Sequence, residues 1–287
     1  MNLNRKFRAH IGVAALAIAS IFAVGATEAS AETVFATTVS NTLVSFDSST
    51  PCVILTSNRI TGLQDGEQIL AIDFRPATGV LYGLGSTSRI YTIDTLTGVA
   101  TAVGSGPFTP ALEGSAFGFD FNPVVDRIRI VSDSGQNLRV NPTTGAVQNV
   151  DGDLSFAASD VNAGNDPFVV GAAYTNPDTN PATGTTLYDI DSALNIVAIQ
   201  NPPNSGTLNT VGGLGVSTND LAGFDISSSN TAFAALKTTG KRTEQRPCGN
   251  SELVTIDLAN GAATSAGYIG TRQPILGLAV VLASSSQ

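Results

Sequence analysis

A strand-rich unit repeats along this chain at a fixed interval. The segment at residues 72–76, IDFRP, has a counterpart at 119–123, FDFNP, and the interval from 72 to 119 is 47 residues. The dipeptides Ile93-Asp94 and Val140-Asn141 are separated by the same interval, and so are the Thr-Gly pairs at 97–98 and 144–145. A repeat of this length, built of short apolar segments, is typical of radial or solenoid arrays. It predicts a ring of similar small sheets.

Short apolar segments bounded by Gly, Pro, Asn and Asp continue to the end of the chain, and no long segment with helical periodicity follows residue 32. We therefore expect an all-β fold, a β-propeller of five blades. Strands at 33–39, 42–46 and 53–57 lack a fourth partner, which the C-terminal segment 275–282 supplies, so the two ends of the chain close the ring. Residues 154–157 are expected to begin the third repeat. A sixth blade stays open because the apolar stretch 208–214 has no assigned blade.

The N-terminus has the pattern of a secretory signal. Arg5, Lys6 and Arg8 precede an uncharged run at 11–26, and Ala-Ser-Ala at 29–31 fits a signal-peptidase site. The run is short for a membrane span, and no later stretch approaches about 20 apolar residues. We expect a signal peptide at 1–31 and a single propeller domain at 32–287, without a membrane span after cleavage and exported to the periplasm or outside the cell.

Cleavage of the signal would change the composition of the chain. The Lys and Arg count falls from 14 to 11 and the Asp and Glu count from 23 to 22, so the net charge becomes 11 − 22 = −11, and the only histidine, His10, is lost. Nucleic acid is excluded as a partner because the chain lacks a basic field. Catalysis by Ser-His-Asp or Cys-His and common zinc sites are excluded because they need imidazole or paired thiolates. Carboxylate chemistry and a hard cation held by oxygens stay open.

Two cysteines, Cys52 and Cys248, lie near opposite ends of the expected domain. An even cysteine count in an exported chain favours a disulfide, which here would close nearly the whole ring. The alternative is two unpaired buried thiols.

Acidic and amide residues recur where the expected strands end. A carboxylate in such a place accepts hydrogen bonds from the backbone N–H groups of its own turn. We therefore expect a structural role for the residues that end innermost strands and third strands, which are Asp73, Asp120, Asp225, Asp94, Asn141, Asp191 and Asp257.

One loop is rich in oxygen ligands and is a candidate calcium site. Its spacing does not match the helix-loop-helix calcium motif, and a plain polar loop is the alternative. The candidate ligands are Asp151, Asp153, Asp160, Asn162 and Asp166.

Arginines are concentrated in one blade. Arg127 and Arg129 share a strand face and Arg139 lies on the neighbouring strand, which makes them a candidate anion-binding patch. The alternative is that they pair with nearby carboxylates such as Asp126 or Asp133.

Three segments carry a family resemblance: AYTN at 173–176, TLYDID at 186–191 and, above all, QNPPNSGTLNTVG at 200–212. They resemble the secreted bacterial domain of unknown function DUF4394, and the resemblance extends over essentially all of the mature chain. It implies a propeller-like fold. It implies no activity and no catalytic residues.

Together these features favour an exported binding or scaffold module, monomeric, with no organic cofactor and with calcium as the metal to consider. The sequence does not identify the ligand, and the lack of histidine in the mature chain argues against an enzyme. Two alternatives are kept: a calcium-dependent or carboxylate-based hydrolase of a lactone or glycan, and a cell-surface or matrix structural protein.

Overall fold

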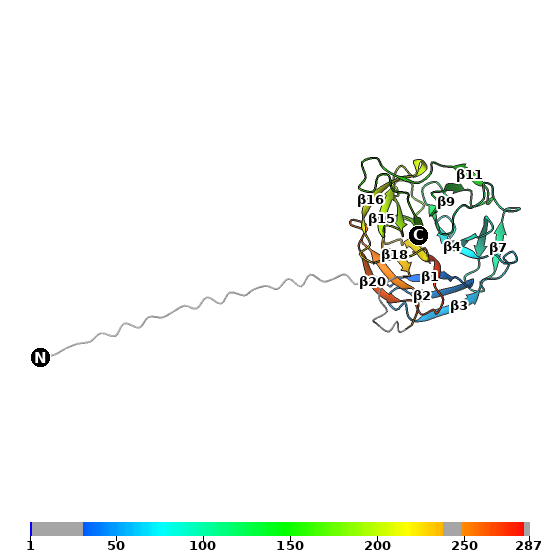
Figure 1. Ribbon diagram of the computed structural model, residues 1–287. Coiled ribbons are helices and arrows are strands. Elements are labelled where there is room, and N and C mark those ends of the chain that lie inside the picture. Colours follow the sequence, from blue (N-terminus) through cyan, green and yellow to red (C-terminus); the bar gives the residue numbers. More distant parts are fainter. Residues whose placement is uncertain (2–30, 238–247, 284–287) are drawn as a thin grey trace. The chain divides into compact units, whose positions relative to one another are not determined.

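The computed structural model describes Met1 and residues 31–237 and 248–283. The expected signal peptide falls almost entirely outside the described residues. From Ala31 onward the chain forms one compact unit, in which five sheets, antiparallel but for one short parallel strand, are arranged as blades around a common axis (Figure 1). This arrangement confirms the all-β, five-bladed propeller.

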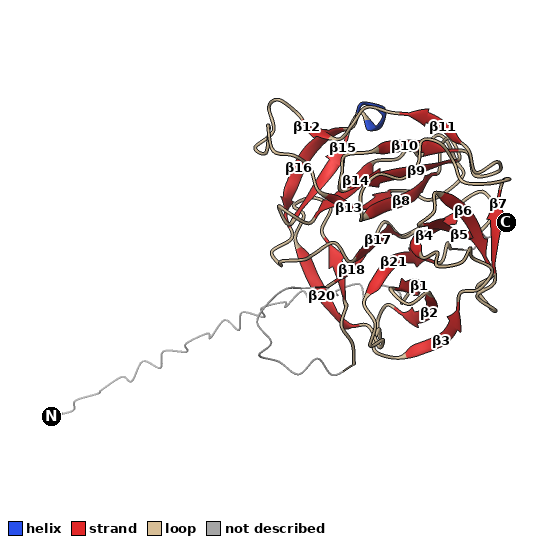
Figure 2. Ribbon diagram, turned by 45° about the vertical axis from the view of Figure 1, so that its right-hand side comes forward, coloured by secondary structure: helices blue, strands red, loops and turns tan. Residues whose placement is uncertain are grey.

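The strands of each blade lie side by side in order from the axis to the rim (Figure 2). Blade 1 contains β21 (Ile275–Val280), β1 (Thr33–Thr38), β2 (Thr42–Asp47) and β3 (Ile54–Arg59). Blade 2 contains β4 (Ile69–Arg75), β5 (Val80–Gly85), β6 (Arg89–Ile93) and β7 (Ala100–Val103). Blade 3 contains β8 (Phe117–Asn122), β9 (Arg127–Ser132), β10 (Asn137–Val140) and β11 (Val147–Val150). Blade 4 contains β13 (Val169–Tyr174), β14 (Leu187–Asp191), β15 (Ile196–Gln200), β16 (Thr207–Gly213) and β12 (Ser155–Phe156), and blade 5 contains β17 (Ala222–Ile226), β18 (Ala232–Leu236), β19 (Glu252–Ile256) and β20 (Ala263–Tyr268).

The two ends of the chain close the ring as expected. The C-terminal strand β21 is the inner strand of blade 1 and pairs antiparallel with β1, from Val34 opposite Val280 to Thr38 opposite Ile275. In Figure 1 the red C-terminal strand accordingly lies beside the blue N-terminal ones. The pairing removes the exposed edges that an open ring would leave at its two ends.

Blade 4 differs from the expected strand order. Residues 154–157 do not begin this blade: β12 is its fifth, outermost strand and pairs in parallel with β16. The apolar stretch 208–214 falls largely within β16, the outer strand of the four-stranded meander, so it makes no sixth blade. The short 3-10 turn η1 (Pro203–Ser205) precedes β16.

Apolar side chains on both faces of the inner strands fill the seams between blades. Between blades 2 and 3, for example, Tyr82 contacts Phe121 edge-to-face with ring centroids 5.1 Å apart. Strands buried on both faces read as continuous apolar runs, which is why the repeat is visible in the sequence. Within the described part of the chain, no helix is long and apolar enough to span a membrane.

A disulfide joins blade 1 to the loop before β19 of blade 5. Cys52 and Cys248 are bonded, with their Cα atoms 5.8 Å apart and a sequence separation of 196. The expected disulfide is confirmed, and it indicates that the chain folds in an oxidising environment.

The loop length sets the expected effect of removing this bond. In the chain-entropy model, releasing a 196-residue loop costs about 5 kcal/mol of stability. We expect the double substitution Cys52→Ser, Cys248→Ser to lower the midpoint of urea unfolding strongly. The far-ultraviolet circular dichroism spectrum should stay that of a β protein, because the pairing of β1 with β21 still closes the ring. An unchanged midpoint would show that the bond does not restrain the unfolded chain.

Candidate functional site

The axis of the ring is formed by one edge strand from each blade: β21, β4, β8, β13 and β17. Because these strands have a β partner on one side only, some of their backbone N–H groups need other acceptors. At one position next to the axis, equivalent in all five inner strands, three strands carry an aspartate, whose carboxylate can accept hydrogen bonds, and two carry an alanine. The residues at this position are Asp73, Asp120, Ala173, Asp225 and Ala279.

Each of these three carboxylates bonds to the next blade. It accepts a hydrogen bond from the backbone N–H of the following inner strand, and the N···O distances are 2.8 Å from Phe121 to Asp73, 3.2 Å from Tyr174 to Asp120 and 2.6 Å from Val280 to Asp225. The carboxylates therefore join neighbouring blades where the sheets themselves cannot pair.

Where an alanine takes the place of the carboxylate, the following blade supplies its own acceptor. After Ala173, the N–H of Ile226 donates to Asp225 of the same strand at 2.6 Å. After Ala279, the N–H of Phe74 donates to Asp73. Three carboxylates thus satisfy the corresponding N–H group of all five inner strands.

The expectation that Asp73, Asp120 and Asp225 serve the turns that follow their strands is wrong. They lie within the strands at the axis and bond to backbone N–H groups of their own and the next strand.

The expectation of turn contacts is confirmed for Asp94, Asn141 and Asp257, which follow third strands and accept hydrogen bonds from N–H groups of their own turns. For example, Asp94 accepts hydrogen bonds from the N–H groups of Leu96 and Thr97, both at 2.9 Å. Asp191 does not end a third strand as expected: it ends β14, the second strand of blade 4, and accepts from the N–H groups of Leu194 in its turn and of Phe168.

The three axial carboxylates, which we call the axial triad, are buried close together. Asp73, Asp120 and Asp225 are 4–6% exposed, and one oxygen from each lies within 4.8 Å of the others. Burial is the main cause that raises the pKa of Asp225 to about 6 and the pKa values of Asp73 and Asp120 well above the usual range, and mutual repulsion adds to it for Asp73 and Asp120. Such a cluster can hold protons or a hard cation, and the donated N–H groups offset part of its negative charge.

A small hollow opens at the start of the inner strands, the mouth of the ring. We call it the mouth hollow. It has a volume of about 290 Å³. One apolar side chain from each inner strand lines it: Leu70, Phe117, Val170, Ala222 and Leu276. Ser115, Ala116, Asn219, Asp220 and Leu221 complete the lining.

Directly below the hollow, the space between the inner strands shrinks to a cavity of about 10 Å³. This volume is close to the space that a single water needs. Glycines at equivalent positions cause this constriction. A Cβ on Gly118 would lie 2.6 Å from the backbone nitrogen of Ala172, and one on Gly223 would lie 2.6 Å from that of Leu278. Four of the five inner strands carry glycine in this layer and β4 carries Ala71, so the strands approach closely and the base of the mouth hollow is closed to anything larger than a water.

The candidate calcium ligands are not gathered around one point. Asp151 pairs with arginines, Asp153 and Asp166 are exposed, and Asp160 accepts hydrogen bonds from Asn162 and Thr210. Asn162 donates its amide to Thr210 at 2.9 Å. Among the described residues, the axial triad is the one group of three or more acidic side chains whose oxygens come within 4.8 Å of one another.

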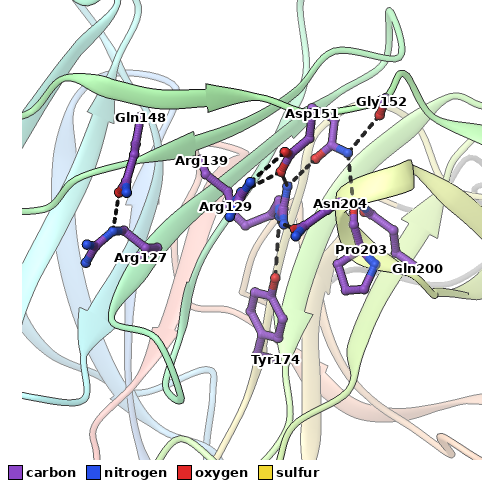
Figure 3. A network of polar contacts seen from close by, with 11 residues as sticks. Arg127, Arg129, Arg139, Gln148, Asp151, Gly152, Tyr174, Gln200, Pro203 and Asn204 are labelled. Atoms are coloured by element: carbon purple, nitrogen blue, oxygen red, sulfur yellow. Dashed lines mark hydrogen bonds and ion pairs between the residues drawn. The ribbon is translucent and has the colours of Figure 1, made fainter.

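Two of the three arginines in the candidate anion-binding patch share a carboxylate (Figure 3). Arg129, 2% exposed, contacts Asp151 at 2.6 Å, and Arg139 bonds both oxygens of Asp151 at 2.7 and 2.9 Å. Arg127 lies apart and donates to Gln148 and to the carbonyl of Asp126. Arg129 and Arg139 thus pair with a carboxylate as in the alternative, but the partner is Asp151 rather than Asp126 or Asp133, and Arg127 pairs with none of the described carboxylates.

The Pro-Pro-Asn segment completes the surroundings of Arg129. Asn204 accepts a hydrogen bond from Arg129 at 2.8 Å, and the carbonyl of Pro203 accepts from Asn137 and Gln200 (Figure 3). This segment therefore locks blade 4 onto the buried arginine of blade 3. The segment is recognisable in the sequence, but its partner Arg129, 75 residues away, is not.

Two further side chains near Arg129 have buried acceptor oxygens without a hydrogen-bond donor. Both carboxylate oxygens of Asp189 and Oε1 of Gln200 have no partner within the described structure. Burial raises the pKa of Asp189 well above its usual range, and the nearby Arg129 acts in the opposite direction. Asp189 lies on β14 between Ala172 and Ala198 of the neighbouring strands.

The axial triad predicts that the protein loses stability as pH rises. The pKa of Asp225 is about 6 in the folded chain against an ordinary 3.8, so between these values the folded state binds more protons than the unfolded state. The free energy of unfolding therefore falls as pH rises through this window, and falls further as Asp73 and Asp120 ionise. We expect Asp225→Asn to reduce this slope, by up to about 1.4 kcal/mol per pH unit, in urea unfolding across the window.

The same substitution in an exposed loop, Asp166→Asn, serves as the control and should leave the slope unchanged. An unchanged slope in Asp225→Asn would contradict the prediction. A calcium effect would contradict it too. If calcium raises the urea midpoint of the native chain, but not that of Asp225→Asn, at pH values above this window, a bound cation balances the charge of the axial triad.

Arg127 and Arg129 offer a matched pair two residues apart on β9. Arg129→Met leaves the amide oxygens of Asn137 and Asn204 without their buried donor, while Asp151 keeps its ion pair with Arg139. Each buried acceptor left unpaired costs about 1–3 kcal/mol, so we expect a loss of at least about 2 kcal/mol in unfolding free energy. Arg127→Met removes a partly exposed contact and should cost less than about 1 kcal/mol. Equal losses in the two variants, measured by urea unfolding, would contradict a structural role specific to Arg129.

Comparison with solved structures finds a structural genomics protein of unknown function from Bacteroides thetaiotaomicron VPI-5482, with a TM-score of 0.48 and 13% sequence identity. The match covers 87% of this chain and 66% of that one. Comparison with curated proteins finds no match. The model of the family described as a domain of unknown function, DUF4394, matches residues 42–279. This match includes most strands of all five blades, and the chain belongs to the DUF4394 family.

Proposed function

We propose that the protein is an exported binding module that takes a small, largely apolar group of its ligand into the mouth hollow. The observation that carries the proposal is the hollow itself: every inner strand contributes one apolar side chain to it, and its base is closed. Concave, mostly apolar sites with a few polar groups are the usual form of small-ligand sites.

Larger hollows of about 600 and 640 Å³ lie elsewhere, but they support the proposal less well. The first is lined by residues 39–41 and 59–68, and the second by strands and turns of blade 2. The mouth hollow depends instead on the assembly of all five blades. A ligand bound there would contact side chains from all five blades.

The burial of the carboxylates at the axis favours a binding function over hydrolysis. A carboxylate hydrolase needs acidic groups that a substrate can reach. The axial triad is 4–6% exposed and engaged by backbone N–H groups, and the channel between it and the mouth hollow is about 10 Å³. The described residues that line the hollow include one carboxylate, that of Asp220.

Export is supported by two features. The disulfide indicates an oxidising environment, and residues 1–31 carry the pattern of a secretory signal. We propose the periplasm or the cell exterior as the site of action.

A methyl-labelled sample tests the proposal. On titration with phenethyl alcohol, a small apolar probe, we expect the NMR signals of the Leu70, Val170, Ala222 and Leu276 methyl groups to shift saturably. Ala222→Leu fills the hollow and should abolish the shifts, whereas Ala262→Leu, at an exposed turn, should leave them unchanged. Shifts that are absent in the native chain, or that persist in Ala222→Leu, would reject the hollow as a binding site.

A further inference from the structure

The mouth hollow combines an apolar floor with a single charge at its rim. Asp220 is the one charged side chain among the described residues that line it, and no lysine or arginine is among them. The polar groups beside it, Ser115 and Asn219, are neutral. A ligand that fits the hollow would therefore meet apolar walls and one carboxylate.

The five-fold repeat shows that this charge belongs to one blade. Asp220 lies three positions before Gly223 of β17. The residues three positions before the equivalents of Gly223 in the other inner strands are Gln68, Ser115, Phe168 and Pro274. None of them is charged, so the rim is polarised toward blade 5.

One hydrogen bond and an ordered turn position the Asp220 carboxylate. Its Oδ1 accepts a hydrogen bond from the hydroxyl of Ser192, a buried residue of blade 4, at 3.0 Å. The neighbouring Asn219 accepts from the N–H of Leu221 at 3.1 Å and so orders the turn before β17. The Asp220 side chain remains exposed, so the carboxylate can accept a hydrogen bond from a ligand while it keeps that from Ser192.

A second carboxylate lies behind the rim on blade 3. Asp133 accepts hydrogen bonds from the backbone N–H of Ser115 at 2.8 Å and from its hydroxyl at 2.5 Å. Its negative charge adds to that of Asp220 near the hollow. The aromatic ring of Phe117, which lines the hollow, also favours a cation over an anion.

We propose that the mouth hollow binds small primary amines with an apolar alkyl or aryl body, whose ammonium group pairs with Asp220. This inference rests on the proposed function, since it assigns a ligand class to the same hollow. The apolar body displaces water from the five inner-strand side chains. The ammonium group donates a charge-assisted hydrogen bond to the carboxylate.

Three probes of similar size and different charge test the proposal: phenethylamine, phenethyl alcohol and phenylacetate. In methyl NMR titrations of the full mature chain at neutral pH, we expect phenethylamine to bind about fivefold more tightly than phenethyl alcohol, and phenylacetate to bind most weakly. The preference should shrink as salt is added, because exposed charges are screened. In Asp220→Asn, which keeps the shape of the side chain, the three affinities should converge. Asp178→Asn, an exposed change away from the hollow, should leave the preference as it is.

The outcomes separate the two claims. If phenethylamine and phenethyl alcohol shift the same methyl signals with equal affinity, or if Asp220→Asn keeps the preference, the amine inference is wrong while binding in the hollow holds. If none of the probes shifts these signals in the native chain, the proposed function itself fails. Folding of each variant is checked by the dispersion of the amide spectrum.

Discussion

The structure depends on how five strand edges meet at one axis. An inner strand of a propeller blade pairs on one side only, and an unpaired buried N–H group is costly. Here three carboxylates accept hydrogen bonds from backbone N–H groups of all five inner strands. Asp73 and Asp225 each serve their own strand and the next, and Asp120 serves the next strand alone. The cost of burying three acidic groups together is reflected in their raised pKa values.

This arrangement also fixes where a ligand can bind. The glycine layer lets the inner strands come close enough for the carboxylates to reach across, and the same close approach seals the channel. What remains accessible on this side of the constriction is the hollow above it, whose floor is made of one side chain from each blade. A requirement of the fold thus leaves a shallow site at the mouth instead of a passage through the ring.

Much of the fold can be predicted from the sequence because buried strands are read directly from apolar runs and their turns. The interval of 47 residues gave blades 2 and 3, and the unmatched terminal segments gave the closure between β1 and β21. Blade 4 was harder, because a short strand such as β12 gains its place only by pairing with β16 in the folded protein. Its apolar pattern alone does not distinguish an inner strand from an outer one.

The sites were harder still, because side-chain partners come from different blades. The partner of Arg129 is Asp151, 22 residues away, and that of Asp73 is a backbone N–H group 48 residues away. Local spacing favoured turn contacts and a calcium loop for these acids. Alignment of β8, β13, β17 and β21 by their glycines, with β4 placed by the 47-residue repeat, would have put Asp73, Asp120 and Asp225 in one layer, and Leu70, Phe117, Val170, Ala222 and Leu276 in another.

Native-state hydrogen exchange at the axis tests the central claim most directly. If the carboxylates satisfy the inner edges, the amide protons of Phe121, Tyr174, Ile226 and Val280 should exchange only through global unfolding, as slowly as that of Ile130 within blade 3. Exchange of these four amides far faster than that of Ile130, in a chain that stays folded, would show that the axis is open and that the carboxylates do not hold the blades together.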